Sequence, residues 1–176
     1  MTPNATALAD QLQAANADAE RILYELAARY DGERPVWTSS VSGPVRVILD
    51  RFATRLARRE FTMCKHLSPD APGPTFWAAW APGRIRCAVC TQAAAQRIQH
   101  TPEDRRCDAC RRDRGHIHGG LVVVPGGLTQ LPGRLGVWPP VTVCHGLCCP
   151  CFTAGGGTCT TDDQRGAARR HSLEQS

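Results

Sequence analysis

The first third of the chain has the periodicity of two amphipathic helices. Residues 5–30 place apolar side chains at three- and four-residue steps, so these side chains share one stripe. The stripe comprises Leu8, Leu12, Ala15, Ala19, Ile22, Leu26 and Tyr30, and Asp31-Gly32 follows as a stop. A second helix is predicted from about Pro44 to Phe61, with Val45, Ile48, Leu49, Phe52 and Leu56 on its apolar face. With a linker at 33–43, residues 1–62 are predicted to form a helical region, an N-terminal helical hairpin.

Beyond residue 62 the pattern changes to short apolar runs separated by turns. Runs at Phe76–Trp80, Leu121–Val124 and Val141–Val143 predict short antiparallel strands, and the Pro-Gly pairs between them predict turns. Thr91–His100 is predicted to be a short helix. Residues 153–176 are Gly-rich and then polar, which predicts a flexible, disordered C-terminal tail. The expected fold class is therefore α+β, with a second domain over residues 63–152.

Cysteine and histidine fall in four close pairs within this second domain. The pairs are Cys64-x-His66, Cys87-x-x-Cys90, Cys107-x-x-Cys110 and Cys148-x-x-Cys151. Two residues between thiolates let one turn present both sulfurs to one metal at about 2.3 Å. Eight ligands suffice for two closed tetrahedral Zn²⁺ sites. The two central pairs alone supply the four ligands of one site, so at least one zinc site is expected. Residues 63–152 are therefore expected to form a zinc-ribbon or treble-clef-like domain held by structural zinc.

Sequence spacing leaves the sharing of ligands between metals open. A sequential arrangement joins the first pair with the second and the third with the fourth, whereas a crossed arrangement joins alternate pairs. A single ribbon made by the second and third pairs is a further alternative, since sixteen residues separate them. Other residues could replace a proposed ligand: His116, His118, Cys144, His145 and Cys149. Cys159 is expected to be a free thiol in the tail.

The basic residues of this 176-residue chain exceed the acidic ones by five, and Lys65 is the only lysine among 21 basic residues. Arginine clusters can contact phosphates or carboxylates, whereas a GC-rich genome can also enrich arginine. The candidate nucleic-acid-binding set comprises Arg51, Arg55, Arg58, Arg59, Arg84, Arg86, Arg105, Arg106, Arg111 and Arg112. Nucleic acid or an acidic protein is the corresponding partner.

Motifs of common enzyme classes do not occur in the chain. HExxH, GxSxG, GxGxxG, the P-loop and the His-x-Glu of zinc deaminases are not found. An HNH-like nuclease using His116 and His118 is a minor alternative, although the usual Asp-His dipeptide is missing. The chain shows neither a secretion signal nor a run of about 20 apolar residues. We therefore expect a cytoplasmic, non-membrane protein whose reduced thiols bind metal.

Three segments carry a resemblance to a group of proteins. The stretch MCKHLSPDAPGPTFWAAWAPGRIRCAVC, followed by EDRRCDAC and GLCCPC, resembles zinc-finger-like proteins of high-GC bacteria and their phages. The resemblance covers about residues 63–151. It implies that the same eight cysteine and histidine residues are the ligand set, and it implies no particular activity.

Together these features predict a structural zinc protein more than an enzyme. The first hypothesis is a non-enzymatic adaptor or regulator that contacts nucleic acid through its arginine-rich surface. The alternative is a protein–protein interaction module that docks, or forms a weak homodimer, through residues 5–30.

Overall fold

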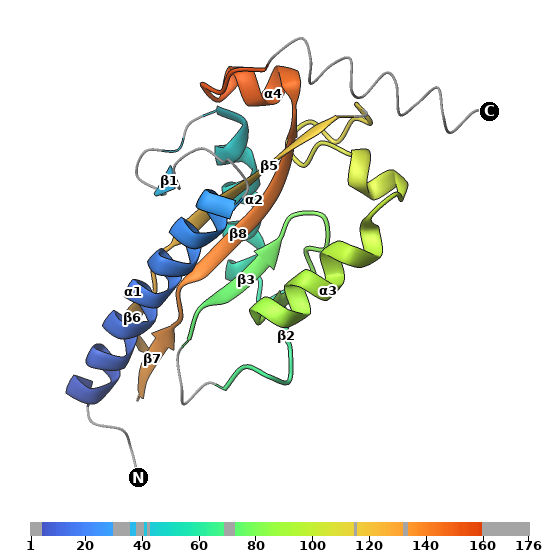
Figure 1. The fold of residues 1–176 in the computed structure, drawn as a ribbon. Coiled ribbons are helices and arrows are strands. Elements are labelled where there is room, and N and C mark those ends of the chain that lie inside the picture. Colours follow the sequence, from blue (N-terminus) through green and yellow to red (C-terminus); the bar gives the residue numbers. More distant parts are fainter. Residues whose placement is uncertain are drawn as a thin grey trace.

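A mixed six-stranded sheet with helices on both faces forms the centre of the protein (Figure 1). The computed structural model describes residues 5–29, 36–37, 41, 43–68, 73–114, 116–131 and 134–159. The helices are α1 (Ala5–Arg29), α2 (Gly43–Ala57), α3 (Ala88–Ile98) and α4 (Cys149–Ala154), with the 3₁₀ helix η2 at Pro102–Arg105. The strands are β1 (Val36–Trp37), β2 (Thr62–Met63), β3 (Thr75–Ala78), β4 (Arg84–Arg86), β5 (Ile117–Val124), β6 (Gly127–Leu131), β7 (Arg134–Trp138) and β8 (Val141–Cys148).

The strand order of the main sheet is β1-β5-β8-β3-β4-β2, and β6 and β7 form a separate hairpin. The long strands β5 and β8 are antiparallel, with Val122 opposite Val143. The pairs β1–β5, β3–β8 and β2–β4 are parallel. The α+β class is confirmed, and the expected antiparallel pairs occur as β3–β4, β5–β8 and β6–β7, but the sheet is mixed because three further pairs are parallel. The parallel pairs join segments far apart in the sequence, which local periodicity does not reveal.

Helix α2 packs on one face of the sheet and forms the main core there. Its buried residues Ile48, Leu49 and Phe52 belong to the same cluster as Trp77 and Val143. The Phe52 and Trp77 rings lie 5.2 Å apart between centroids. The predicted apolar face of this helix is confirmed. The domain boundary between residues 62 and 63 stays a prediction, and across it α2 and the sheet share one core.

Helix α1 crosses in front of the sheet, whereas α2 lies behind it (Figure 1). Of its predicted stripe, Leu8, Leu12, Ala15 and Ala19 are buried, whereas Ile22 is only partly buried and the neighbouring Leu23 is buried instead. The helix contacts β5 and β7, and the Asn16 side chain accepts a hydrogen bond from the Gly126 N–H at 2.8 Å. The two amphipathic helices therefore pack mainly on the sheet, rather than on each other as the predicted hairpin required. Tyr30, Asp31-Gly32 and most of the linker lie outside the described residues.

The chain beyond residue 148 is ordered further than the sequence predicted. Helix α4 runs to Ala154, and a disulfide joins Cys149 to Cys159. Gly156 has a φ of 98°, a left-handed conformation that glycine adopts without strain, where the chain turns back. The prediction of a disordered tail from residue 153 is therefore wrong for residues 153–159. The remaining residues, 160–176, lie outside the described part.

Candidate metal centres

The first centre lies where the parallel strands β2 and β4 end. Met63 pairs with Ile85, and the Cys64 N–H donates to the Ile85 carbonyl at 2.9 Å. Because parallel neighbours end at the same edge of a sheet, Cys64 and Cys87, which follow β2 and β4, lie together. Cys87 is the N-cap of α3, so Cys90 falls in the first turn of this helix. The tight turn after β2 adds His66.

The spacing of the four ligand atoms in the first centre suits a tetrahedral metal. These atoms, from Cys64, His66, Cys87 and Cys90, all lie within 4.8 Å of one another. His66 Nδ1 is 3.2 Å from Cys90 Sγ and 3.8 Å from Cys87 Sγ. Zinc bonds of about 2.0 Å to nitrogen and 2.3 Å to sulfur give a tetrahedral N–S edge of about 3.5 Å. The two N–S distances in the structure, 3.2 and 3.8 Å, lie on either side of that value.

The second centre lies at the end of β8, on a loop held by a reciprocal pair of hydrogen bonds. The Asp108 N–H donates to the Gly146 carbonyl at 2.8 Å, and the Gly146 N–H donates to Asp108 Oδ2 at 2.7 Å. This pair holds the Cys107–Cys110 turn beside Cys148, the N-cap of α4. Cys110 Sγ and Cys148 Sγ are 3.8 Å apart. A tetrahedral S–S edge around zinc is also about 3.8 Å.

The two centres share one local arrangement, and their candidate ligands group sequentially, which is one of the alternatives that the spacing left open. In each, a strand leads to a cysteine at a helix N-cap, and a second cysteine follows in the first helical turn. Cys107, Cys110, Cys148 and Cys151 group together in the second centre, apart from the first four ligands. Within the described residues, neither the crossed arrangement nor the single ribbon of the two central pairs occurs. The cause is strand order, because β2 lies beside β4 and the Cys107–Cys110 turn lies beside β8.

Hydrogen bonds favour the thiolate form of one cysteine in each centre. Burial opposes ionisation of Cys64, but N–H donors, including that of Cys87 at 3.3 Å from the sulfur, leave its pKa below the ordinary value. Burial likewise opposes ionisation of Cys110, and the Arg112 N–H together with neighbouring thiols lowers its pKa to about 7. Since the thiolate is the form that binds metal, these donors pre-organise both sites.

Two of the possible replacement ligands lie in the sheet interior instead. Burial raises the pKa of Cys144 to about 12 and lowers that of His145 to about 4. His145 lies over Gly120, where an added Cβ would come 2.3 Å from its ring. Among the described residues neither joins a group of three or more ligands. Cys144 and His145 are therefore part of the packed sheet rather than of a metal centre.

Two of the other possible replacements, His118 and Cys149, gather with Cys159 in a third cluster that sequence spacing did not predict. His118, Cys149 and Cys159 have ligand atoms within 4.8 Å of one another. The disulfide between Cys149 and Cys159 overturns the expectation that Cys159 is a free thiol. The sequence signal was the Gly155–Gly157 run, which allows the chain to return within ten residues. His116 packs edge-on against His118, with ring centroids 4.5 Å apart.

Several arginines of the predicted nucleic-acid-binding set have intramolecular partners. Arg51 donates to the carbonyls of Asp108 and Ala109 at 2.6 and 3.1 Å, so it ties α2 to the second centre. Arg86 donates to the Ala81 and Arg84 carbonyls. The remaining partners are Glu60 for Arg55 and Arg58, Thr62 for Arg84, Asp113 for Arg105 and Asp108 for Arg111. These contacts reduce the set that is available to a partner.

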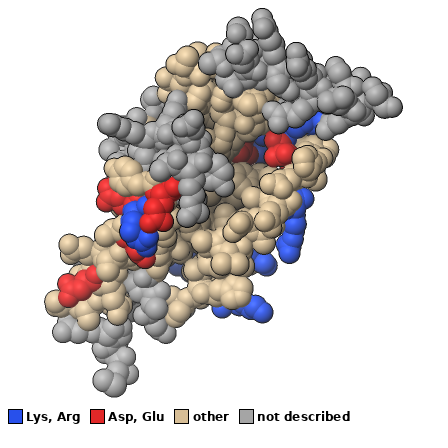
Figure 2. Space-filling model, in the orientation of Figure 1, with Lys and Arg blue, Asp and Glu red and all other residues tan. Residues whose placement is uncertain are grey.

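The other three members of the set are exposed. Arg59, Arg106 and Arg112 have no ion pair to another described residue. Figure 2 shows acidic residues over α1 and separate basic groups along the opposite edge of the same face. The basic charge is therefore distributed in small groups on this face rather than in one continuous stripe.

Comparison with known proteins identified no relative of this chain. The chain matches no known protein family, no curated protein and no solved structure. The resemblance of residues 63–151 to zinc-finger-like proteins therefore stays a prediction. In the described part of the chain, every helix is too short or too polar to cross a membrane.

Proposed function

We propose that this protein is a structural zinc protein, a non-enzymatic adaptor or regulator that contacts nucleic acid with arginines beside its second metal centre. The observation that carries the proposal is the pair of four-ligand clusters. Four protein ligands fill a tetrahedral zinc ion, whereas a catalytic zinc normally keeps one position open. Both clusters therefore have the composition of sites that hold a fold together.

Zinc is the metal that this ligand chemistry favours. One cluster offers three cysteines and one histidine, and the other offers four cysteines. Thiolate-rich tetrahedral sites select zinc or iron–sulfur chemistry, and the histidine in the first cluster favours zinc. Structural zinc contributes roughly 10 kcal/mol or more per site to folding. That contribution suits a chain whose centres anchor the ends of short strands.

Nucleic acid is the partner supported by the exposed arginines of the second centre. Arg106 and Arg112 flank the Cys107–Cys110 turn, and both are exposed. A turn fixed by a metal holds such side chains on a rigid base, which lowers the entropy cost of binding. The net charge of +5 adds long-range attraction to phosphate.

A protein partner at the first centre is a second candidate with its own observation. Val89 and Met63 are 75% and 47% exposed, and both lie next to ligands in the sequence. Apolar side chains exposed on a rigid metal turn are typical of protein contacts. A homodimer through residues 5–30 has less support, because Leu8, Leu12, Ala15 and Ala19 of the α1 stripe are already buried within their own chain.

The nucleic-acid proposal is tested by fluorescence anisotropy with single-stranded RNA and duplex DNA at increasing salt. We expect binding that weakens steeply with salt, since phosphate contacts release counterions. The Arg106→Ala/Arg112→Ala double variant should lower the salt slope by roughly one for each arginine that touches a phosphate. Arg21→Ala is the charge control, because this arginine is paired with Asp18 and Glu25 on α1. Weak binding of both nucleic acids at low salt, or equal effects of all these variants, overturns the proposal.

A further inference from the structure

The third cluster differs from the two centres in composition and in its redox state. It contains His118 of β5, Cys149 of α4 and Cys159. His118 Nε2 is 3.2 Å from Cys149 Sγ, while the two cysteines form a disulfide. The chain has ten cysteines, and seven of them belong to the two four-ligand centres. Of the other three, Cys144 is buried in β8, so Cys149 and Cys159 remain for separate chemistry.

The framework around this cluster holds His118 and Cys149 in place. The His118 ring stacks on Phe152 of α4, with centroids 4.2 Å apart and planes 7° from parallel. Cys149 lies between Cys148 and Cys151, two residues of the second centre. Strand β5 holds His118 because it pairs with β8 directly before α4. The imidazole and the first sulfur are therefore pre-organised by the second centre.

The second sulfur, from Cys159, can complete a three-ligand set once the disulfide is reduced. Cys159 returns through a glycine turn, and its Cα lies 5.7 Å from that of Cys149. Two thiolates on one tetrahedral zinc lie about 3.8 Å apart, so the sulfurs must separate by a small movement of the Cys159 segment. The ligand atoms already lie within 4.8 Å of one another.

We propose that His118 and the reduced Cys149 and Cys159 hold a third metal ion of the zinc class, at a site with one open coordination position. Only three described residues contribute to this cluster. Three protein ligands and an exchangeable fourth position are characteristic of zinc sites that bind small ligands. A pocket of about 510 Å³ adjoins the site, lined by Cys149, Pro150, Thr153, Ala154 and Cys159.

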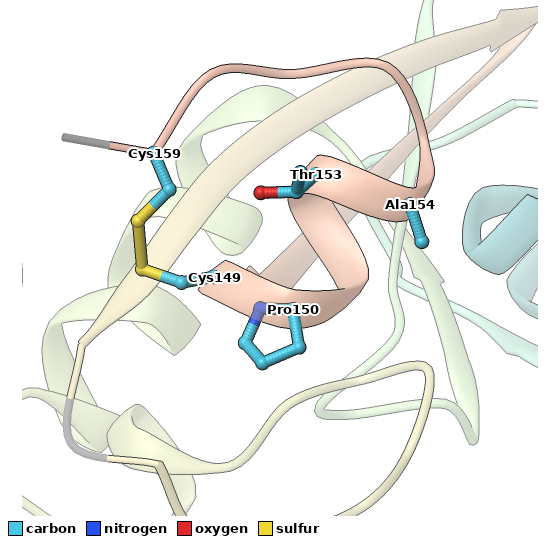
Figure 3. Close-up of a pocket in the computed structure, with 5 residues that line it drawn as sticks. All are labelled: Cys149, Pro150, Thr153, Ala154 and Cys159. Carbon is cyan, nitrogen blue, oxygen red and sulfur yellow. A yellow bond between two sulfur atoms is a disulfide. The ribbon is translucent and has the colours of Figure 1, made fainter.

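The pocket places the open position within reach of solvent and small ligands. Figure 3 shows both sulfurs on one side of the pocket, with the Thr153 hydroxyl directed toward them. This hydroxyl can donate a hydrogen bond to a water molecule or a small anion on the metal. The first and second centres, with four protein ligands each, offer no such position.

Oxidation converts this site to the disulfide form and releases the metal. Two zinc-bound thiolates react with one low-molecular-weight disulfide, whose S–S bond breaks. The protein gains the Cys149–Cys159 bond, and the products are one Zn²⁺ ion and two small thiolates. The protein sulfurs lose two electrons, which the small disulfide accepts. Two small thiols reverse the reaction, reducing the protein disulfide to two thiols and forming a small disulfide. The two four-ligand centres keep their metal throughout.

Native mass spectrometry of the full chain, purified without added metal and then loaded with zinc, tests the proposal. With glutathione as reductant we expect three zinc ions per chain. With glutathione disulfide we expect two, together with a protein mass lower by two hydrogens. A chelator titration of the reduced protein should remove the third zinc first. Two zinc ions under both conditions overturn the third site, whereas fewer than two in the oxidised protein contradict the structural centres of the proposed function instead.

Matched variants assign the third metal to its ligands. Under reducing conditions, Cys159→Ser and His118→Gln should each lower the zinc content from three ions per chain to two. Cys144→Ser, which alters a buried cysteine outside the cluster, should retain three. With cobalt in place of zinc, the third equivalent should add weaker thiolate-to-cobalt absorption than the first two, because two thiolates bind it. Retention of the third metal by Cys159→Ser overturns the assignment.

Discussion

Burial of neutral His145 should make the folded protein less stable as the pH falls below neutrality, because the unfolded chain takes up a proton there that the folded chain does not. This side chain is 7% exposed in β8, and its Nδ1 atom has no hydrogen-bond partner among the described residues. Burial lowers its pKa from 6.5 to about 4, because the imidazolium loses hydration that nothing in the sheet replaces. The unfolded chain therefore binds more protons than the folded chain between these two values. Stability that is present above pH 6.5 is lost as the pH falls through this window.

The magnitude follows from the two pKa values. At pH 7.5 the histidine of the unfolded chain is mostly neutral, so its titration changes the free energy of unfolding by close to zero. At pH 5.5, one unit below the pKa in the unfolded chain, the titration lowers the free energy of unfolding by about 1.4 kcal/mol. Substitution of His145 by leucine removes the titration and the unpartnered Nδ1 atom. Between pH 7.5 and 5.5, the free energy of unfolding of the variant should therefore fall by about 1.4 kcal/mol less than that of the parent protein.

Urea unfolding at pH 7.5 and 5.5, at fixed free zinc, measures this difference. Protonation of metal-bound thiolates destabilises parent and variant alike, so it cancels when the two pH dependences are subtracted. Thr142→Val, a buried substitution in the same strand without a titratable group, should follow the parent profile. Equal pH dependences of parent and His145→Leu would refute the reasoning, as would a His145 ring titration near 6.5 in the folded protein by NMR.

Three further predictions concern packing, an arginine that contacts the second centre, and metal removal. Gly120→Ala should destabilise by roughly 1–3 kcal/mol in thermal unfolding, because its Cβ would come 2.3 Å from the buried His145 ring. Gly119→Ala meets nothing within 4 Å and should cost less; equal losses would contradict the packing argument. Arg51→Ala should cost roughly 1–3 kcal/mol in urea unfolding, since it leaves the Asp108 and Ala109 carbonyls without this donor. Arg58→Ala, which breaks a 3.8 Å pair at a side chain 69% exposed, should cost less than about 1 kcal/mol. Chelation of zinc should abolish amide protection around Cys107 and Cys148, both almost fully buried, and unchanged hydrogen exchange would argue against a structural metal.

Features set by neighbouring residues could be predicted from the sequence. The apolar stripes of α1 and α2 appear in the structure because helical periodicity decides which side chains share a face. The cysteine and histidine pairs were recognisable because one turn is enough to bring two ligands together. The identity of the eight clustered residues is therefore encoded locally, and all eight occur in the two centres.

The grouping of those pairs depended on contacts between distant segments. Only the parallel pairing of β2 with β4 brings Cys64 to Cys87, and only the Asp108–Gly146 hydrogen bonds bring the third pair to the fourth. The role of Arg51 also depended on distant contacts. The charge pattern predicted that Arg51 contacts a nucleic-acid partner, whereas in the structure it donates to the carbonyls of Asp108 and Ala109. The pairing of Cys149 with Cys159 likewise required the turn that follows α4. Sequence alone thus determined which residues are candidate ligands, whereas tertiary structure decided which of them meet, because strand order is fixed by non-local packing and hydrogen bonding.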